Sequence, residues 1–283
     1  MQPRTENYSK EYLTDLHIAF NSAFSDYFTA FQPTADQFEK RIHNKLNILN
    51  ELSIVALDGS YIVGFVLHTL NYYQGKLTMY NGGTGVIPSH RKQKVASLLF
   101  EESMKKALQW PDKIERVLLE VVNNNHKAIS LYESVGFGFN RELQCFMLDG
   151  KVNSQNSQII IKQSFEFKEE YRAHLIFEPS FLDSSNQVVY NLVNETILEA
   201  WWKGELTGHI IFNPNLGRIS QLAVNPLYRN HGVAKRMVAR AQELSINKLS
   251  LLNVPSDEIE TIIALERIGF RKGLTQFELQ LSL

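Results

Sequence analysis

The feature that most constrains the fold is an internal repeat in this 283-residue sequence. The stretch PSHRKQKVASLL, which begins at Pro88, is echoed 138 positions later by PLYRNHGVAKRM, which begins at Pro226. Further along, LYESVGFGF is echoed by LERIGFRKG, with the two Gly-Phe pairs 133 positions apart. A period this long indicates a duplicated domain rather than a short-repeat solenoid. We therefore predict two related domains in one chain.

The polar stretch DGKVNSQNSQ separates the two copies and has the composition of a linker. We predict a first domain over residues 1–150 and a second domain over residues 151–283. The second copy is shorter at its front. We therefore expect it to lack one or both of the helices that hydrophobic periodicity predicts near the start of the first copy. Thr34, followed by Gln37 three positions later, is the cap candidate for the second of these helices.

Within the first copy, the pattern changes from helices to strands. Asp58-Gly59 predicts a hairpin turn between two β-rich runs. The next strand, KLTMYNGGTGVI, contains three glycines, which favour a bulge or a close approach of backbone. Helices are predicted from Lys94 to about residue 109 and from Asn125 to about residue 135, with the strand RVLLEVV between them.

The turn after Pro88 has the features of an anion-binding loop. Pro88 ends a strand, and a basic turn with Arg91 leads into an apolar helix. The first turn of that helix leaves backbone N–H groups without helical acceptors, and these groups attract phosphate together with the helix dipole. Neither a Walker pattern nor a GxGxxG fingerprint is present. A solvated basic turn that begins a surface helix is the alternative.

A second motif, LLEVVNNNHKAISLYESVGF, begins at Leu118. Glu120 alternates with apolar neighbours along a strand, so its side chain should point to the opposite face. Asn125 is a good cap for the following helix, which carries Tyr132 and ends at Gly136. The alternative reading makes Tyr132 a core aromatic residue and Glu120 a surface acid.

The two motifs together resemble those of the GNAT superfamily, the Gcn5-related N-acetyltransferases. The first has the family form V-x-P-x-x-R-x-x-G-x-[GA], with Lys94 where the family usually has glycine. The second is most similar to the branch of ribosomal-protein-alanine N-acetyltransferases. The resemblance covers most of residues 5–148 and is weaker over residues 165–283. It implies an α/β (α+β) fold of two tandem domains, each a mixed, mostly antiparallel sheet flanked by helices.

The resemblance also implies acetyl-CoA as the acyl donor, bound along the loop and the strand before it. Loop N–H groups would hold the pyrophosphate, and the strand backbone would run alongside the pantetheine arm. The implied cofactor-binding residues of the first domain are Thr84, Gly85, Val86, Arg91, Lys92, Gln93, Lys94, Val95, Ala96, Ser97 and Asn125. A second cofactor site in the other copy would use Leu222, Ala223, Val224, Arg229, Asn230, His231, Gly232, Val233, Ala234 and Lys235.

Catalytic roles follow from motif position in the same way. An alkylamine is mostly protonated at pH 7 and must lose a proton before it attacks a thioester. The resemblance implies Glu120 as the proton acceptor, directly or through water, and Tyr132 as the proton donor to the leaving thiolate. We therefore expect an acetyl-CoA-dependent N-acetyltransferase that transfers acetyl directly to a primary amine in the first domain. A non-catalytic acyl-CoA-binding or regulatory module is the alternative.

The second copy keeps the loop but departs from the later motif. Aligned on the Gly-Phe pairs, Leu265 replaces Tyr132 and Glu258 replaces Asn125. Leucine cannot donate a proton, and Glu258 would add negative charge beside an anionic cofactor. We expect a degenerate second domain that binds coenzyme A without turnover, shapes the acceptor site, or only packs against the first domain.

The acceptor is poorly constrained. By analogy with the family, it would lie near AFSDYFTAFQ, where Asp26 would hold a cationic amine and Tyr27 and Phe31 would form an apolar wall. An ordinary helix end with core aromatics is the alternative. Both small-molecule amines and peptide amines remain open as substrates.

Composition limits the kinds of partner and the cellular location that we expect for this protein. The formal net charge of −1 provides no global field that would attract nucleic acid or an acidic membrane. Cys145 is the only cysteine, which excludes an intramolecular disulfide and fits a reducing compartment. The eight histidines show no metal-like pairing, and no apolar run is long enough to span a membrane. We expect a cytoplasmic protein without a metal, and a homodimer is left open.

Overall fold

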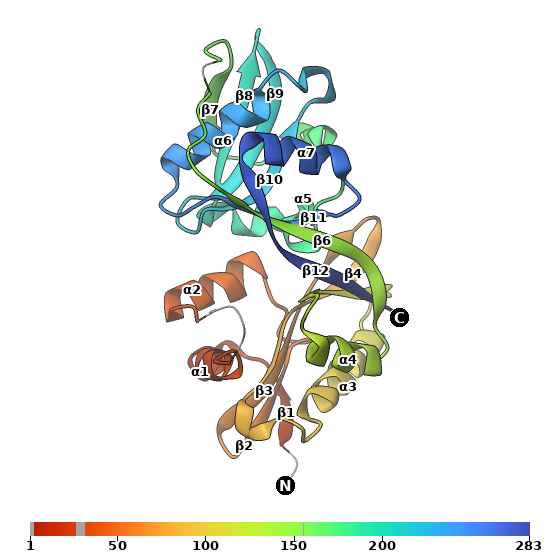
Figure 1. The fold of residues 1–283 in the computed structure, drawn as a ribbon. Coiled ribbons are helices and arrows are strands. Elements are labelled where there is room, and N and C mark those ends of the chain that lie inside the picture. The colour runs from red at the N-terminus through yellow and green to blue at the C-terminus, as the bar shows by residue number, and fades with distance from the viewer. Residues whose placement is uncertain (1–2, 27–31, 155) are drawn as a thin grey trace. The chain divides into compact units, whose positions relative to one another are not determined.

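The structure, a computed structural model, describes residues 3–26, 32–154 and 156–283. The chain divides into two compact units. Unit 1 comprises Met1–Asn140 together with Leu279–Leu283, and unit 2 comprises Arg141–Glu278. Figure 1 shows the elements of both units along the chain.

Unit 1 contains two opening helices, a sheet and two further helices. Its elements are β1 (Arg4–Asn7), η1 (Lys10–Tyr12), α1 (Leu13–Ala23), α2 (Ala35–Lys40), η2 (Arg41–Lys45), β2 (Ile54–Asp58), β3 (Tyr61–Tyr73), β4 (Lys76–Val86), η3 (Pro88–His90), α3 (Val95–Leu108), β5 (Arg116–Val122), α4 (His126–Ser134) and the start of β6 (Gly138–Leu148). Thr34 caps α2 in a reciprocal capping box with Gln37, as the sequence predicts.

Unit 2 repeats this order but begins differently. Its elements are the rest of β6, β7 (Ile160–Ser164), η4 (Glu169–His174), η5 (Phe181–Asp183), α5 (Ser185–Val188), η6 (Val189–Asn194), β8 (Thr196–Trp202), β9 (Glu205–Asn213), β10 (Arg218–Val224), η7 (Pro226–Tyr228), α6 (Val233–Leu244), β11 (Ser250–Pro255), α7 (Ile259–Ile268) and most of β12 (Phe270–Ser282). Short 3-10 turns and the four-residue α5 stand where unit 1 has α1 and α2.

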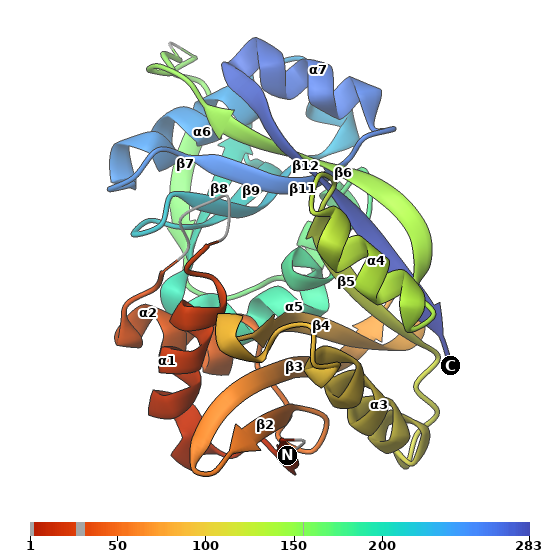
Figure 2. The same ribbon diagram turned by 60° about the horizontal axis from the view of Figure 1, so that its bottom comes forward.

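The sheet of unit 1 is covered by helices on both faces. Successive residues of β3 point to opposite faces. Phe65 therefore stacks on Phe20 of α1 at 5.7 Å between ring centroids, whereas Gly64 lies against Val95 and Leu99 of α3. Figure 2 shows α1 and α2 on one side of this sheet and α3 and α4 on the other.

In unit 2, the core between the sheet and helices α6 and α7 contains Ile210, Phe212, Met237 and Leu265. The opposite face of the sheet is covered by the short turns, where Tyr171 and Ile211 are fully buried. The predicted fold class is therefore confirmed: each unit is a mixed, mostly antiparallel sheet flanked by helical elements. The parallel pairs are β4 with β5 and β10 with β11.

The last strand of each sequence copy lies partly in the unit that the other copy forms. The strand order is β1-β2-β3-β4-β5-β12-β6-β11-β10-β9-β8-β7. From Arg141 onward, β6 belongs to unit 2, where Met147 lies opposite Ser250 of β11. The chain end returns to unit 1, where the Leu283 N–H donates to the Glu115 carbonyl at 3.1 Å.

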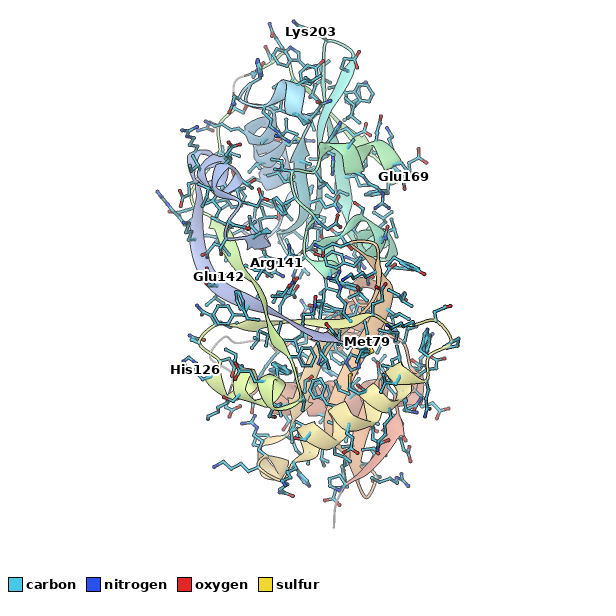
Figure 3. The ribbon with its side chains drawn as sticks, turned by 90° about the vertical axis from the view of Figure 1, so that its right-hand side faces the viewer. Met79, His126, Arg141, Glu142, Glu169 and Lys203 are labelled. Carbon is cyan, nitrogen blue, oxygen red and sulfur yellow. The ribbon has the colours of Figure 1, made fainter. Side chains whose placement is uncertain are left out.

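Unit 2 holds β6 and β12 together through side chains as well as backbone. The guanidinium of Arg141, labelled on β6 in Figure 3, donates two hydrogen bonds of 3.0 Å to the buried carboxylate of Glu278. Among the helices that the structure describes, none has both the length and the apolar character that a membrane span requires.

Candidate functional site

The two loops that the sequence repeat singles out have the same backbone conformation. In unit 1, Lys92 and Lys94 both have a φ of 61°, and in unit 2 Asn230 and Gly232 have φ values of 63° and 82°. These left-handed residues occupy the same places in each loop. The repeat in sequence is therefore a repeat in local structure.

The arginine of each loop folds back onto the strand before it. The Arg91 Nε donates to the Val86 carbonyl at 3.2 Å, and the Arg229 Nε donates to the Val224 carbonyl at 3.4 Å. Each arginine thereby ties the turn to the end of its strand. The sequence predicts that this arginine supplies positive charge for a phosphate. The structure shows that it also makes a hydrogen bond to the strand before the loop.

Each loop leads into a long helix, α3 of 14 residues and α6 of 12 residues. The first N–H groups of each helix lie beyond the reach of helical acceptors and face the loop. The left-handed residue that starts the helix explains why the family prefers glycine there. Lys94 adopts a conformation that L-residues with a side chain rarely adopt. Around Gly232, a Cβ atom would meet no atom within 4 Å.

The bulge predicted from the glycines of β4 is present. The register between β3 and β4 shifts so that Leu67 lies opposite Gly83 and His68 opposite Asn81, which leaves Gly82 as the extra residue. A Cβ at Gly82 would lie 2.4 Å from Leu46. Unit 2 has the corresponding shift between Ile219 and Gln221 of β10.

Side-chain hydrogen bonds hold this bulge. In the structure, the Gly83 N–H donates to the Asn81 Oδ1 at 2.9 Å, and the Asn81 Nδ2 donates to the Thr84 hydroxyl at 2.7 Å. Asn81 therefore stabilises the bulge internally. Gly85 has a different role, since a Cβ there would lie 2.4 Å from Phe65 and 3.0 Å from Ala23.

Glu120 lies where two parallel strands part. β4 and β5 pair at only three positions, the last of which joins Tyr80 and Leu118. Glu120 follows two residues later on β5, partly buried, and its Oε2 accepts a hydrogen bond from the Tyr80 hydroxyl. The carboxylate is therefore held at the point where the sheet opens.

Tyr132 lies on α4, the helix that follows this strand. Its ring packs edge-on against Phe100 of α3 and against Phe137, at 5.8 and 5.9 Å between centroids. The residue is partly exposed. Asn125 caps α4, since its Oδ1 accepts from the Ala128 N–H at 3.3 Å. The sequence predicted this cap.

Asp26, a candidate for binding the acceptor amine, pairs with the arginine of the first loop. The Arg91 Nη1 and Nη2 donate to its two carboxylate oxygens at 2.5 and 2.8 Å, and Nη2 also reaches the Ala23 carbonyl. The hydrogen bonds from Arg91 lower the pKa of Asp26, and those to Asp26 raise the pKa of Arg91. Tyr27 and Phe31 lie outside the described residues.

Unit 2 contains a pocket of about 410 Å³ between the loop, β10, β11 and α7. β10 and β11 pair at only two positions, Arg218 with Ser250 and Ile219 with Leu251, and then separate. Eight of the ten residues proposed for a second cofactor site line this pocket: Leu222, Val224, Arg229, Asn230, Gly232, Val233, Ala234 and Lys235. Ala223 and His231 are not among its lining residues.

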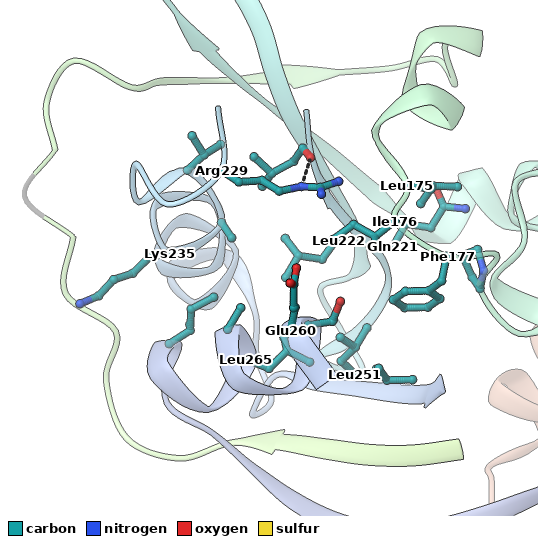
Figure 4. Close-up of a pocket in the computed structure, with 18 of the residues that line it drawn as sticks. Leu175, Ile176, Phe177, Gln221, Leu222, Arg229, Lys235, Leu251, Glu260 and Leu265 are labelled. Carbon is teal, nitrogen blue, oxygen red and sulfur yellow. Dashed lines mark hydrogen bonds between the residues drawn. The ribbon is translucent and has the colours of Figure 1, made fainter. Parts of the chain in front are cut away.

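The pocket is mainly apolar, with charges at its edges. Figure 4 shows Arg229, Leu222 and Glu260 around it, with the ammonium group of Lys235 pointing away from the other labelled side chains. No carboxylate pairs with Arg229 among the residues that the structure describes, in contrast to Arg91. Within the described ranges, the charge of Arg229 is therefore not neutralised by an ion pair.

Leucines take the places of both proposed catalytic residues in unit 2. Leu265 lines the pocket at the position of Tyr132. Ser250 pairs with Arg218 as Leu118 pairs with Tyr80, so Leu252 is level with Glu120 and also lines the pocket. The next residue, Asn253, is buried in the irregular part of β11 with a φ of 61°.

The helix caps of the two units also differ. Glu258 stands at the start of α7 but makes no side-chain hydrogen bond to the helix, unlike Asn125. Burial raises the pKa of Glu258, and the neighbouring Asp257 and Glu260 add to this effect. The negative charges of Asp257 and Glu260 thus disfavour the ionised form of Glu258.

Sequence reasoning missed the wall of the pocket that comes from the segment LIFEPSFLD. Leu175, Ile176, Phe177 and Asp183 line the pocket from this irregular segment, which has no periodicity or motif. It also missed Tyr80 as the partner of Glu120. The signal available for Tyr80 was its place in the strand, two residues before Gly82, the first of the glycines.

Comparisons with known proteins show the family of the chain. The profile of the acetyltransferase (GNAT) family matches residues 17–137 and residues 163–270. N-alpha-acetyltransferase 30 of Dictyostelium discoideum is 30% identical over 92 residues, which are 32% of this chain and 49% of that protein. The match thus spans about half the length of that relative.

Two solved structures share the fold over the whole chain. A putative acetyltransferase from Pyrococcus horikoshii has a TM-score of 0.74 and 11% identity, covering 100% of this chain and 90% of that one. A tandem GNAT protein from the clavulanic acid biosynthesis pathway has a TM-score of 0.73 and 13% identity, covering 99% and 98%. With both sequence repeats matched by the family profile, the chain belongs to the acetyltransferase (GNAT) family as a tandem two-domain member.

Proposed function

We propose that this protein transfers an acetyl group from acetyl-CoA directly to a primary amine, and that unit 1 is the working site. The observation that carries the proposal is the position of Glu120 where β4 and β5 diverge, followed by the helix that bears Tyr132. Unit 2 has Leu252 and Leu265 at these two positions. Only unit 1 therefore carries side chains that transfer protons there.

The first loop fits an anionic cofactor. The N–H groups from Lys92 to Ser97 surround the start of a 14-residue helix, whose dipole favours negative charge. Lys92 and Lys94 add positive charge, whereas Arg91 is partly neutralised by Asp26. The backbone from Thr84 to Val86 would flank the pantetheine arm, and Asn125 would contact it. Acetyl-CoA, when bound, supplies the acetyl group as a thioester.

The chain's own residues would manage the two proton transfers. Glu120 would accept the proton that the ammonium form of the substrate must lose, directly or through a water molecule. Tyr132 would hold a proton at its hydroxyl and donate it to the sulfur of the leaving thiolate. No covalent intermediate with the enzyme is needed, because the neutral amine can attack the thioester itself.

The test is a turnover assay with acetyl-CoA and a library of amines, followed by substitution of Tyr132. We expect Tyr132→Phe to lower kcat by ten-fold or more, because the ring keeps its packing while the acid is lost. Coenzyme A affinity, measured by calorimetry, should change little. A variant with full turnover on an established substrate would remove Tyr132 from the acid role.

A second candidate function is favoured by the pocket of unit 2. We propose that this pocket binds coenzyme A or an acyl-CoA without turnover. Its volume, its unneutralised Arg229 and the open space around Gly232 suit an anion with an apolar arm. The leucines at the acid and base positions would prevent reaction there.

The acceptor is proposed only as a class. The relative named N-alpha-acetyltransferase 30 favours a peptide N-terminus, and small-molecule amines remain in the same screen. The single cysteine and the net charge of −1 support a cytoplasmic enzyme without a nucleic-acid or membrane partner. A homodimer is a further proposal, which sedimentation at several protein concentrations would test.

A further inference from the structure

A buried tyrosine of β4, Tyr80, is hydrogen-bonded to the proposed proton acceptor Glu120. Tyr80 is only 4% exposed and lies at the last position where β4 pairs with β5. Its hydroxyl donates to the Oε2 of Glu120 on the neighbouring strand, across the gap where the strands begin to part. A carboxylate accepts this bond in its ionised form, and phenols keep their proton until far higher pH.

The backbone around Tyr80 is held by hydrogen bonds on both sides of the residue. The next residue, Asn81, fixes the bulge through hydrogen bonds with Gly83 and Thr84. Tyr80 itself is held in the ladder with β3, opposite Thr69. The phenol hydroxyl is therefore presented from a fixed backbone rather than from a loop, which limits the orientations open to the carboxylate.

Unit 2 provides an internal comparison. Arg218 occupies the place of Tyr80, and its guanidinium donates to the buried Asp183 at 2.8 Å. Leu252 is level with Glu120. The tyrosine and the glutamate therefore occur together in unit 1, and both are replaced in unit 2.

We propose that Tyr80 is a positioning residue for Glu120. Its hydroxyl holds one carboxylate oxygen, fixes the side-chain orientation and stabilises the ionised form that accepts the substrate's proton. Tyr80 is not assigned any contact with the substrate or the cofactor. This inference rests on the proposed role of Glu120 as the proton acceptor.

A double-mutant cycle separates a role through Glu120 from a structural role. We expect Tyr80→Phe to lower kcat by about ten-fold, since a hydrogen bond to a charged group is lost while the ring remains. The KM for acetyl-CoA should stay within about two-fold. In a Glu120→Gln background, the same substitution should cause no further loss of kcat, because the group through which it acts is gone.

Tyr8→Phe is the matched control. Tyr8 is a buried tyrosine of the same unit, 1% exposed, and its hydroxyl has no hydrogen-bond partner among the described residues. Its substitution should leave kcat unchanged. Calorimetric coenzyme A binding by each variant shows that the fold is intact.

The outcomes are distinguishable. Equal losses of kcat from Tyr80→Phe in the two backgrounds would overturn the inference while leaving the role of Glu120 in place. A Tyr80→Phe variant with undiminished kcat would overturn it as well. Undiminished turnover by Glu120→Gln alone would instead contradict the proposed function.

Discussion

His68 shows how a single buried residue can make the stability of unit 1 depend on pH. It is fully buried on β3, and its Nδ1 lies 3.0 Å from the Leu52 carbonyl. A carbonyl oxygen only accepts, so Nδ1 carries the proton of the neutral ring. Burial lowers the pKa of His68 to about 4, and the bond to Leu52 opposes this effect only in part.

The sign of the resulting pH dependence follows from this lowered pKa. Well above pH 6.5 the ring is neutral in both the folded and the unfolded chain, so the site has no effect on the free energy of unfolding. As the pH falls from about 6.5 toward 4, the unfolded chain binds a proton that the folded chain does not. At pH 5 this costs about 2 kcal/mol of unfolding free energy.

We expect His68→Asn, which keeps a donor for Leu52, to lose less stability than the parent protein between pH 7.5 and pH 5. Urea unfolding at both pH values measures the difference, and groups other than His68 cancel in the comparison. Equal pH dependence of the two proteins would show that His68 does not stay neutral in the folded state.

At the scale of one element, the loop before α3 and the loop before α6 can be compared directly. Both place a left-handed residue at the start of the helix, a lysine in unit 1 and a glycine in unit 2. A left-handed conformation costs a residue with a side chain on the order of 1 kcal/mol or more. The sequence predicted the loop and the helix, but it did not predict that Lys94 is strained.

Exchanging these two residues tests the strain. We expect Lys94→Gly to raise the unfolding free energy of unit 1 by about 1 kcal/mol and Gly232→Lys to lower that of unit 2 by a similar amount. Hydrogen exchange measured on peptides of α3 and α6 reports the two units separately. Shifts of the same sign in both units would argue against backbone strain as the cause.

At the scale of the whole molecule, we propose that unit 1 binds the cofactor and carries out the chemistry, whereas unit 2 only binds. Unit 1 has the glutamate, its tyrosine partner and Tyr132, whereas unit 2 has a large pocket lined by leucines at the equivalent places. If both loops hold coenzyme A, each chain should bind two molecules and use one. Ala96 and Ala234 occupy equivalent positions in the first turns of α3 and α6.

We expect calorimetry to find two coenzyme A molecules per chain. Ala234→Glu should remove one by placing a carboxylate at the anion site, and turnover should persist. Ala96→Glu should remove the other and abolish turnover. Loss of turnover in a folded Ala234→Glu variant would contradict the assignment of catalysis to unit 1.

The sequence by itself determined the features that depend on local pattern. The repeat predicted two related domains, the glycines predicted the bulge in β4, and the capping residues Thr34 and Asn125 start the helices they were expected to start. The two motifs also placed the chain in its family. These features follow from short-range rules of turns, caps and strand alternation, which a few neighbouring residues satisfy.

Only the tertiary structure decided which residues meet across the chain. Pairing of Asp26 with Arg91 and of Tyr80 with Glu120 joins residues 65 and 40 positions apart. The exchange of strand ends and the pocket wall at Leu175–Phe177 likewise depend on distant segments. Strand alternation fixes which face a residue occupies, but not which strand becomes its neighbour. That choice depends on burial and hydrogen bonding summed over the whole unit.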